Sequence, residues 1–297
     1  MNAQGALWIA FHVIVLGVLA FDLGVLARKT HAPSAREAGC LSALWVLLSL
    51  VFGVGVWSWR GHEAGLAFLT GYLLEKLLSV DNTFVFLAIF NAFSVPRTLQ
   101  PKVLKWGILS ALVLRAVCIL TGAVLLHRFA WVVYIFGGVI LWTGFRMLRA
   151  RRRNAAALEL PPLIDGLRRR VPAAQGSFLW VLIAVEVADL IFAIDSIPAV
   201  FAVTTDPFIV YTSNVFAVLG LRAMYFLLVG AMDRFRRLHI GLALILMFVG
   251  FKMLASGVYD VPIGVSVALI AAILGAAVAG SFFSHDAREK AGVTHGV

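Results

Sequence analysis

The chain has 297 residues, of which 62% are hydrophobic and 13% are charged, with a mean hydropathy of +0.96 and a formal net charge of +10. A soluble domain carries roughly 25% charged residues, so this excess of apolar side chains indicates a polytopic membrane protein. The composition excludes a soluble enzyme, a nucleic-acid-binding domain and a disordered regulator.

Nine apolar segments are long enough to cross a bilayer, which takes about 20 residues at 1.5 Å per residue. In chain order they are Leu7–Ala27, Leu41–Trp59, Leu66–Phe93, Leu104–Leu126, Trp131–Leu148, Phe178–Thr204, Phe208–Gly230, Ile240–Ser256 and Pro262–Phe283. We therefore predict an all-α polytopic membrane protein with about nine transmembrane helices.

The positions of Lys and Arg predict the orientation of these segments. Nineteen of the 25 basic residues fall in the loops after segments one, three, five and seven and in the C-terminal tail. The opposite face carries only Arg60 and Arg128. Because cytoplasmic loops are enriched in Lys and Arg, we expect the N-terminus outside the cell and the C-terminus in the cytoplasm. The Arg runs at 151–153 and 168–170 follow the same bias, and anionic lipid headgroups, not nucleic acid, are their expected partner.

Three landmarks recur in the same order in the two halves of the chain. Two carboxylates six residues apart occur as Glu75 and Asp81 and again as Asp189 and Asp195. An Arg-Ala pair follows in each half, at 115–116 and 222–223, and then the sequences GFRML (144–148) and GFKML (250–254). Each unit contains three helices, an odd number, so the second must be inverted relative to the first, as in many secondary transporters.

This inverted 3+3 helix repeat divides the chain into five parts. Residues 1–65 hold two N-terminal transmembrane helices, 66–150 the first repeat, 151–176 a basic cytoplasmic linker, 177–257 the second repeat, and 258–297 the last transmembrane helix and a cytoplasmic tail. Transporters of this plan place the substrate site at the repeat interface, near the middle of the membrane.

Five carboxylates lie inside two of the apolar segments, where each charge costs roughly 2.5 to 3.5 kcal/mol on insertion scales. They are Glu75, Asp81, Glu186, Asp189 and Asp195. Three buried basic residues, Lys76, Arg115 and Arg222, are expected to pair with them. Purely structural ion pairing is one explanation of these charges. Five acids against three bases leave two negative charges, however, which suits one divalent cation or protons.

Polar groups beside these acids extend the candidate site. We expect Ser79–Asn82 and Asp195–Pro198 to interrupt their helices and to expose backbone carbonyls. Carboxylate, amide, hydroxyl and carbonyl oxygens suit Mg, Ca and Mn, whereas zinc or copper selection would call for Cys, His or Met. The candidate metal ligands are Glu75, Asp81, Asn82, Glu186, Asp189, Asp195 and Ser196. Asp22, near the end of the first segment, is a candidate accessory group.

The stretches EKLLSVDN (75–82), DSIPA (195–199) and LRAMYF (221–226) resemble those of the TerC family of integral membrane proteins, and the similarity covers nearly the whole chain. That family belongs with the lysine-exporter type of transporters, is associated by name with tellurium resistance, and includes manganese exporters. The resemblance implies a bacterial inner-membrane protein that exports Mn²⁺ from the cytoplasm, with the five acids as its pathway. The residues alone indicate only a divalent cation with oxygen ligands.

Three functions compete at this stage. The first is a secondary transporter that exports Mn²⁺ as its substrate and takes up protons, since protonation of carboxylates lowers metal affinity. The second is a transporter of an anion such as tellurite or of an amino acid, and an anion site would need an excess of buried Arg or free helix N-termini. The third is a membrane scaffold that docks other proteins on its linker. The sequence has no Walker A motif, so direct ATP drive is not expected. As a transporter the chain is expected to have no enzymatic activity and no permanently bound cofactor, and the oligomeric state is left open.

Overall fold

The computed structural model describes residues 3–24, 34–150, 161–170, 177–229, 238–259 and 261–292. Some side chains within these ranges, including those of Asp22 and Asp81, lie outside the description. The described part folds into helices and contains no β-strand, which confirms the all-α prediction for these residues. The helices are α1 (Ala3–Gly24), α2 (Ala35–Arg60), α3 (His62–Ala92), α4 (Gln100–Arg128), α5 (Val132–Ala150), α6 (Pro162–Arg170), α7 (Phe178–Phe201), α8 (Pro207–Leu219), α9 (Leu221–Val229), α10 (Leu238–Ala255) and α11 (Ile263–Gly292).

Every predicted apolar segment coincides with a helix, and the seventh coincides with the pair α8 and α9. By length and apolar composition, α2, α4 and α5 can each cross a membrane, and α8 and α9 can do so together as one span bent by 42°. Helices α3 and α7 are as long, but they carry the acidic residues singled out above. The described helices therefore fit a multi-pass membrane protein, and the number nine stays a prediction.

Local sequence explains several helix ends. Ser34 and Glu37 form a capping box that starts α2, each side chain bonding the other residue's backbone N–H. Gly61 separates α2 from α3 with a φ of 91°, a conformation that side chains other than glycine rarely adopt. Asp206 caps α8 by accepting hydrogen bonds from the backbone of Phe208 and Ile209.

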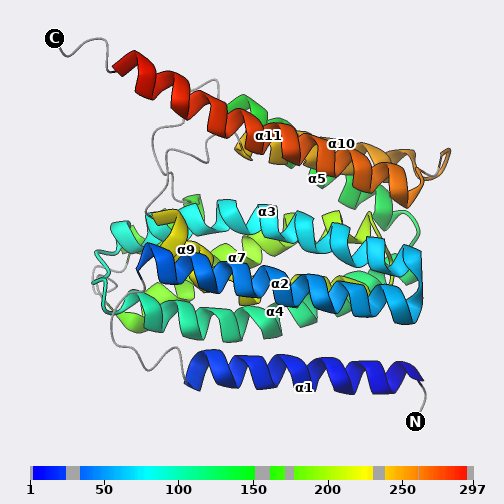
Figure 1. Cartoon of the computed structure of the whole chain (residues 1–297), viewed down its shortest axis with the longest axis horizontal. Coiled ribbons are helices and arrows are strands. Elements are labelled where there is room, and N and C mark those ends of the chain that lie inside the picture. Colours follow the sequence, from blue (N-terminus) through cyan, green and yellow to red (C-terminus); the bar gives the residue numbers. More distant parts are fainter. Residues whose placement is uncertain are drawn as a thin grey trace.

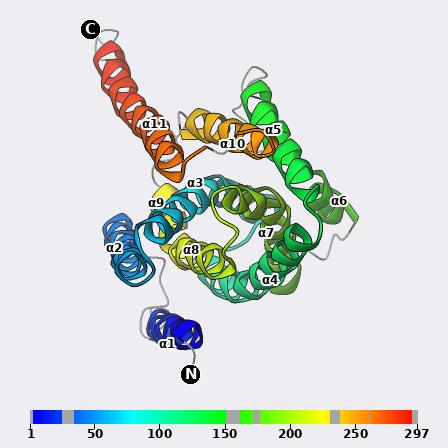
Figure 2. The same cartoon turned by 90° about the vertical axis from the view of Figure 1, so that its right-hand side faces the viewer.

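The helices form a central bundle with additions on two sides. Helices α2, α3, α4, α7, α8 and α9 make up the bundle, while α5, α10 and α11 lie along one side and α1 lies on the opposite side (Figures 1 and 2). Helix α1 contacts α8 mainly through aromatic rings, with Trp8 and Phe11 packed on Phe208 and Tyr211. The centre of the bundle is thus enclosed by α3, α4, α7 and α8.

The outer surface of the bundle is apolar. Helix α4 buries one face and exposes an opposite stripe of Val113, Val117, Leu120 and Val124, each more than half exposed. Such a stripe would be unfavourable in water and is favourable against lipid chains. Exposed tryptophans also mark the outer surface of α2, α4 and α5.

Helices α5 and α10 are in unusually close contact because glycines line their interface. A Cβ on Gly250 would lie 2.6 Å from the backbone nitrogen of Leu141, and a Cβ on Gly144 would lie 2.8 Å from the carbonyl oxygen of Ala243. Backbones therefore touch along this pair, as small residues allow in membrane helix packing.

The two predicted helix interruptions are wrong. Helix α3 continues through Ser79–Asn82, where the Thr83 hydroxyl bonds the Ser79 carbonyl. Helix α7 continues through Pro198 and ends at Phe201. Because Pro198 lies in the last turn, the hydrogen bond that it cannot donate does not interrupt the helix. The described part instead breaks a span at Gly220, between α8 and α9.

Candidate functional site

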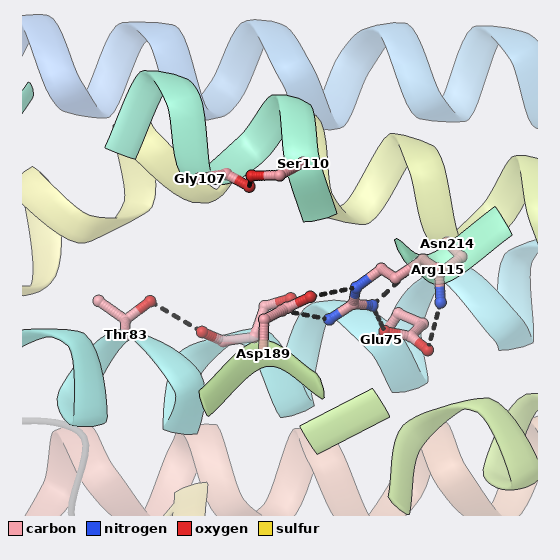
Figure 3. Close-up of polar contacts among 8 residues, drawn as sticks. Glu75, Thr83, Gly107, Ser110, Arg115, Asp189 and Asn214 are labelled. Atoms are coloured by element: carbon pink, nitrogen blue, oxygen red, sulfur yellow. Dashed lines mark hydrogen bonds and ion pairs between the residues drawn. The ribbon is translucent and has the colours of Figure 1, made fainter. Parts of the chain in front are cut away.

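Arg115 lies at the centre of the bundle and is 1% exposed. Its Nε and Nη2 donate to the two carboxylate oxygens of Asp189 at 3.3 and 3.0 Å, and its Nη1 donates to Glu75 Oε2 at 2.7 Å. Figure 3 shows the guanidinium between these two carboxylates. One arginine therefore joins α4 to both α3 and α7.

Asn214 on α8 completes this arrangement. Its Nδ2 donates to Glu75 Oε1 at 2.7 Å, and its Oδ1 accepts from Arg115 Nη1 at 3.0 Å (Figure 3). Glu75, Arg115, Asp189 and Asn214 are called the Arg115 network below. Every carboxylate oxygen in it accepts a hydrogen bond, and two ionised acids with one arginine give it a formal charge of −1. Breaking such a fully buried network by removing one partner is costly.

Glycines bring the four helices close enough for these contacts. A Cβ on Gly71 of α3 would lie 2.9 Å from the Ser213 hydroxyl of α8. A Cβ on Gly107 of α4 would lie 3.3 Å from Val185 of α7. The close approach of α3 to α8 lets Asn214 contact Glu75, and the close approach of α4 to α7 lets Arg115 contact Asp189.

Glu186 lies one turn before Asp189 and contacts α4. The Ser110 hydroxyl donates to Glu186 Oε1 at 2.6 Å, while Glu186 Oε2 is buried with no hydrogen-bond partner among the described groups. Ser110 Oγ also lies 2.7 Å from the carbonyl oxygen of Trp106. Ser110 therefore divides its one hydroxyl proton between the Glu186 carboxylate and the Trp106 carbonyl.

A small cavity adjoins these acids. It lies where α3, α4, α7, α8 and α9 meet, its walls are apolar, and Asp189 is the ionisable residue in its lining. It has room for about one water molecule. Asp189 therefore borders both Arg115 and an apolar cavity.

Asp195 contacts a different helix. The buried Thr143 hydroxyl of α5 donates to Asp195 Oδ1 at 3.0 Å. The third acid of α7 is thus held at the junction between the bundle and the α5–α10 pair, and its own side chain is partly exposed.

The remaining predicted site residues have varied surroundings. Lys76 Nζ, Asn82 Nδ2 and Ser196 Oγ are buried with no hydrogen-bond partner among the described groups, so Lys76 shows no bond to a carboxylate there. Arg222 is half-buried on α9 and has an interaction partner. The predicted roles of Asp22 and Asp81 concern side chains outside the described part.

The described acids do not gather into one metal site. Glu75 and Asp189 share Arg115, Glu186 contacts Ser110, and Asp195 contacts Thr143. Among the described side chains, no three His, Cys, Asp or Glu residues are placed to hold one metal ion.

Three polar residues of this region escaped the sequence reasoning: Ser110, Thr143 and Asn214. Each is a neutral residue within an apolar helix, so charge counting could not find it. An Asn in the middle of a membrane segment was the strongest available signal, since its amide needs partners there.

Comparisons with known proteins also indicate an integral membrane protein. The family model described as "Integral membrane protein TerC family" matches residues 60–291. The chain is 47% identical to "Uncharacterized membrane protein STKORF319" of Myxococcus xanthus, over 93% of this chain and 91% of that protein. It is 45% identical to "Putative membrane-bound redox modulator Alx" of Escherichia coli K12, over 92% of this chain and 94% of that protein. No solved structure matches the chain. With most of its length matched by the family model, the chain belongs to the TerC family of integral membrane proteins.

Proposed function

We propose that this chain is a secondary transporter that exports a divalent metal ion, Mn²⁺, from the cytoplasm through the carboxylates of α3 and α7. The observation that carries the proposal is the Arg115 network, in which two acids from different helices are buried with a single arginine. Charges inside membrane segments are expensive and mark ion pathways by default.

The network also supports a site between two repeat units. Arg115 and Glu75 belong to the first unit, whereas Asp189 and Asn214 belong to the second. Helix α3 of the first unit packs on α8 of the second, and α7 of the second packs on α4 of the first. Reciprocal packing of this kind, in which each unit contacts the other through matching helices, is what an inverted repeat would produce. Substrate sites of such transporters lie at the interface between the two units.

The charge balance favours a cation over an anion such as tellurite. Four of the five N–H donors of Arg115 bond Asp189, Glu75 and Asn214, so one N–H remains and no free pair of donors is left to grip an anion. Glu186 Oε2, in contrast, is a buried acceptor with no donor among the described groups. A site with a net negative charge and spare oxygens attracts cations.

The acids divide into two groups with different roles in this proposal. Glu75 and Asp189 are fixed by Arg115 and provide the negative field of the site. Glu186 and Asp195 each have one hydroxyl contact and can turn toward a cation. Each of them offers carboxylate oxygens beside a hydroxyl, and oxygen ligands suit Mn²⁺ better than Zn²⁺ or Cu²⁺.

The proposed coupling to protons rests on the unpartnered carboxylate oxygen of Glu186. Glu186 Oε2 is buried with no hydrogen-bond partner among the described groups, and a proton and a metal ion compete for such a carboxylate oxygen. We propose that Glu186 carries the exchanged proton.

Direct redox chemistry by the chain itself receives little support. The name of the Escherichia coli relative refers to redox modulation. The two cysteines of this chain, Cys40 and Cys118, are both free, so no disulfide joins them. Export of a redox-active metal would change cellular redox state without any thiol chemistry in this protein.

Reconstituted protein tests the proposal. Proteoliposomes loaded with a metal-sensitive dye should accumulate Mn²⁺ faster when the proton concentration is higher inside than outside, because protons then leave as Mn²⁺ enters. Inverted membrane vesicles should respond to the same gradient in the same way. Asp195→Asn and Glu186→Gln should each reduce the rate at least tenfold. Asp165→Asn is the matched control, because Asp165 lies on α6 and pairs with Arg168 and Arg169 outside the bundle.

The outcomes separate the competing functions. Full Mn²⁺ transport by both acid variants would refute the pathway. Lack of Mn²⁺ movement by the parent protein, with tellurite movement instead, would favour an anion transporter. A scaffold would move neither ion and would tolerate both substitutions. The proposed setting is the bacterial inner membrane, with the N-terminus outside and the C-terminus in the cytoplasm, and cysteine labelling of the termini in whole cells tests it.

A further inference from the structure

The two repeat units contact each other through equivalent residues where α5 packs on α10. A Cβ on Gly144 of α5 would lie 2.8 Å from the carbonyl oxygen of Ala243 on α10. A Cβ on Gly250 of α10 would lie 2.8 Å from the carbonyl oxygen of Gly137 on α5. The repeat aligns Gly144 with Gly250, and the same alignment pairs Gly137 with Ala243. Each contact is therefore the two-fold counterpart of the other, which supports an inverted relation between the units.

The Arg115 network departs from this two-fold relation. Glu75 and Asp189 are equivalent in the repeat, and both bond the same arginine. The position equivalent to Arg115 is occupied by a second arginine, Arg222. The described hydrogen bonds to the four carboxylate oxygens of the acids come from Arg115 and Asn214. The chain thus has two equivalent arginines for one pair of acids, and Arg115 holds that pair in this structure.

The helices that carry the two arginines differ in the same way. Helix α4 is continuous through Val113 and Arg115, whereas the equivalent segment is divided into α8 and α9, which are bent by 42°. The break lies at Gly220, the equivalent of Val113, two residues before Arg222. Arg115 on the straight helix is fully buried, and Arg222 beyond the bend is half-buried. A straight helix therefore accompanies the arginine that reaches the acids, and a bent helix accompanies the other.

The packing beside the acids differs between the two halves as well. Phe86 and Val185 line the small cavity, together with Leu221, which directly follows the break. The repeat equivalents of Phe86 and Val185 are Val200 and Gly71. These two residues are in close contact, since a Cβ on Gly71 would lie 3.0 Å from Val200. The space beside the acids is therefore next to the bent helix, and the equivalent place in the other half is filled.

We propose that Arg115 and Arg222 exchange places between the two acids of the network, and that the cavity changes sides with them. In the exchanged state, α8 and α9 form one straight helix with Arg222 between Glu75 and Asp189. Helix α4 then bends at Val113, and Arg115 leaves the acids. One arginine replaces the other, so the formal charge of the buried group stays at −1. The exchange rests on the proposed transport function, for which it opens a fixed site to each side of the membrane in turn.

Asn214 explains why the Arg115 state is the favoured one. Its amide bonds both Glu75 and Arg115. The repeat equivalent of Asn214 is Gly107, which has no side chain to make the corresponding bonds in the exchanged state. The exchanged state is therefore the minor one, and changes that make a bend in α4 easier should raise its population.

Distances between spin labels test the exchange. Val113→Gly gives α4 the residue found at the break, and Val113 is exposed on the outer stripe, so little packing is lost. Labels are placed on Val54→Cys of α2 and Val124→Cys of α4, both exposed, after replacement of the two native cysteines by alanine. A 42° bend at Val113 would move Val124 sideways by about 12 Å. Double electron–electron resonance on the full-length protein should show a second distance at least threefold more populated in Val113→Gly than in the parent.

Two further variants separate the exchange from simple weakening of the helix. Val117→Gly, one turn further along the same exposed stripe, is the matched control and should keep the distances of the parent. Arg222→Met in the Val113→Gly background should remove the second distance, because no arginine is then left to replace Arg115. If Val113→Gly does not yield folded protein, Asn214→Ala takes its place, since it removes bonds that belong to the Arg115 state alone.

The outcomes support the exchange or overturn it. A single distance in Val113→Gly, the same second distance in Val117→Gly, or its persistence after Arg222→Met would each overturn it. The labels report conformation and not transport. A protein that moves no metal yet shows the Arg222-dependent distance would refute the proposed function and leave the exchange standing. Mn²⁺ transport by a protein with a single distance in every variant would overturn the exchange alone.

Discussion

Replacement of Arg115 by Met should be among the most damaging changes in the bundle. Arg115 makes four hydrogen bonds to Glu75, Asp189 and Asn214, and methionine preserves the apolar stem while removing all of them. The formal charge of the buried group then changes from −1 to −2. Breaking one buried ion pair in this way costs roughly 3 to 5 kcal/mol.

The cost should fall when the acids are neutralised as well. In Arg115→Met combined with Asp189→Asn, one of the unpaired charges is gone, so we expect the double variant to be more stable than Arg115→Met alone. Stability is measured by SDS titration in mixed micelles, followed by circular dichroism. Arg128→Met, at the exposed end of the same helix, is the control and should stay within about 0.5 kcal/mol of the parent.

Two results would refute this reasoning. If Arg115→Met unfolds at the same SDS fraction as the parent, the arginine does not stabilise the acids. If Asp189→Asn makes Arg115→Met still less stable, the damage comes from lost packing and not from unpaired charge.

Three further changes test other contacts of the fold. Asp206→Asn keeps the cap of α8 but removes the ion pair with Arg60 at the end of α2, so thermal unfolding should show a loss of stability below about 1 kcal/mol. Asp206→Ala also removes the cap and should lose about 1 kcal/mol more. Gly250→Ala forces α10 away from α5 and should cost about 1 to 3 kcal/mol in SDS unfolding, whereas Gly138→Ala, with open space around its Cβ, should be neutral. Thr143→Val removes the hydroxyl that holds Asp195 and should raise the KM for Mn²⁺ in proteoliposomes more than it lowers kcat; an unchanged KM would count against the assignment of Asp195.

Most helices could be predicted from the sequence because each long apolar run has few alternatives in a membrane. The pairing of Arg115 with an acid could also be expected, since a lone buried arginine is unfavourable. Which acid it would choose could not be predicted. Helical spacing defines the side of a helix on which Glu75 or Asp195 lies, but not which helix packs there. Only the packing shows that Glu75 and Asp189 share Arg115 while Asp195 contacts α5.

The break at Gly220 was missed for a related reason. Proline is the stronger helix breaker in water, so Pro198 drew attention, whereas glycine in a membrane segment usually signals close packing. Gly220 both ends a helix and lies in a close contact, because α8 stops before it and Lys76 and Trp45 lie against it. Asn214 was missed because a neutral side chain leaves the charge balance unchanged.

The place of Arg115 along α4 has an electrical consequence. It lies fifteen positions after Gln100 at one end of the helix and thirteen positions before Arg128 at the other, near the middle of a 29-residue span. An ion that reaches the network from either side therefore crosses about half of the transmembrane voltage. For a divalent ion this amounts to roughly 2.3 kcal/mol per 100 mV. Occupancy of the site should consequently depend on membrane potential, and a potassium-valinomycin potential imposed on proteoliposomes would change the apparent affinity for the metal even if one complete transport cycle moved no net charge.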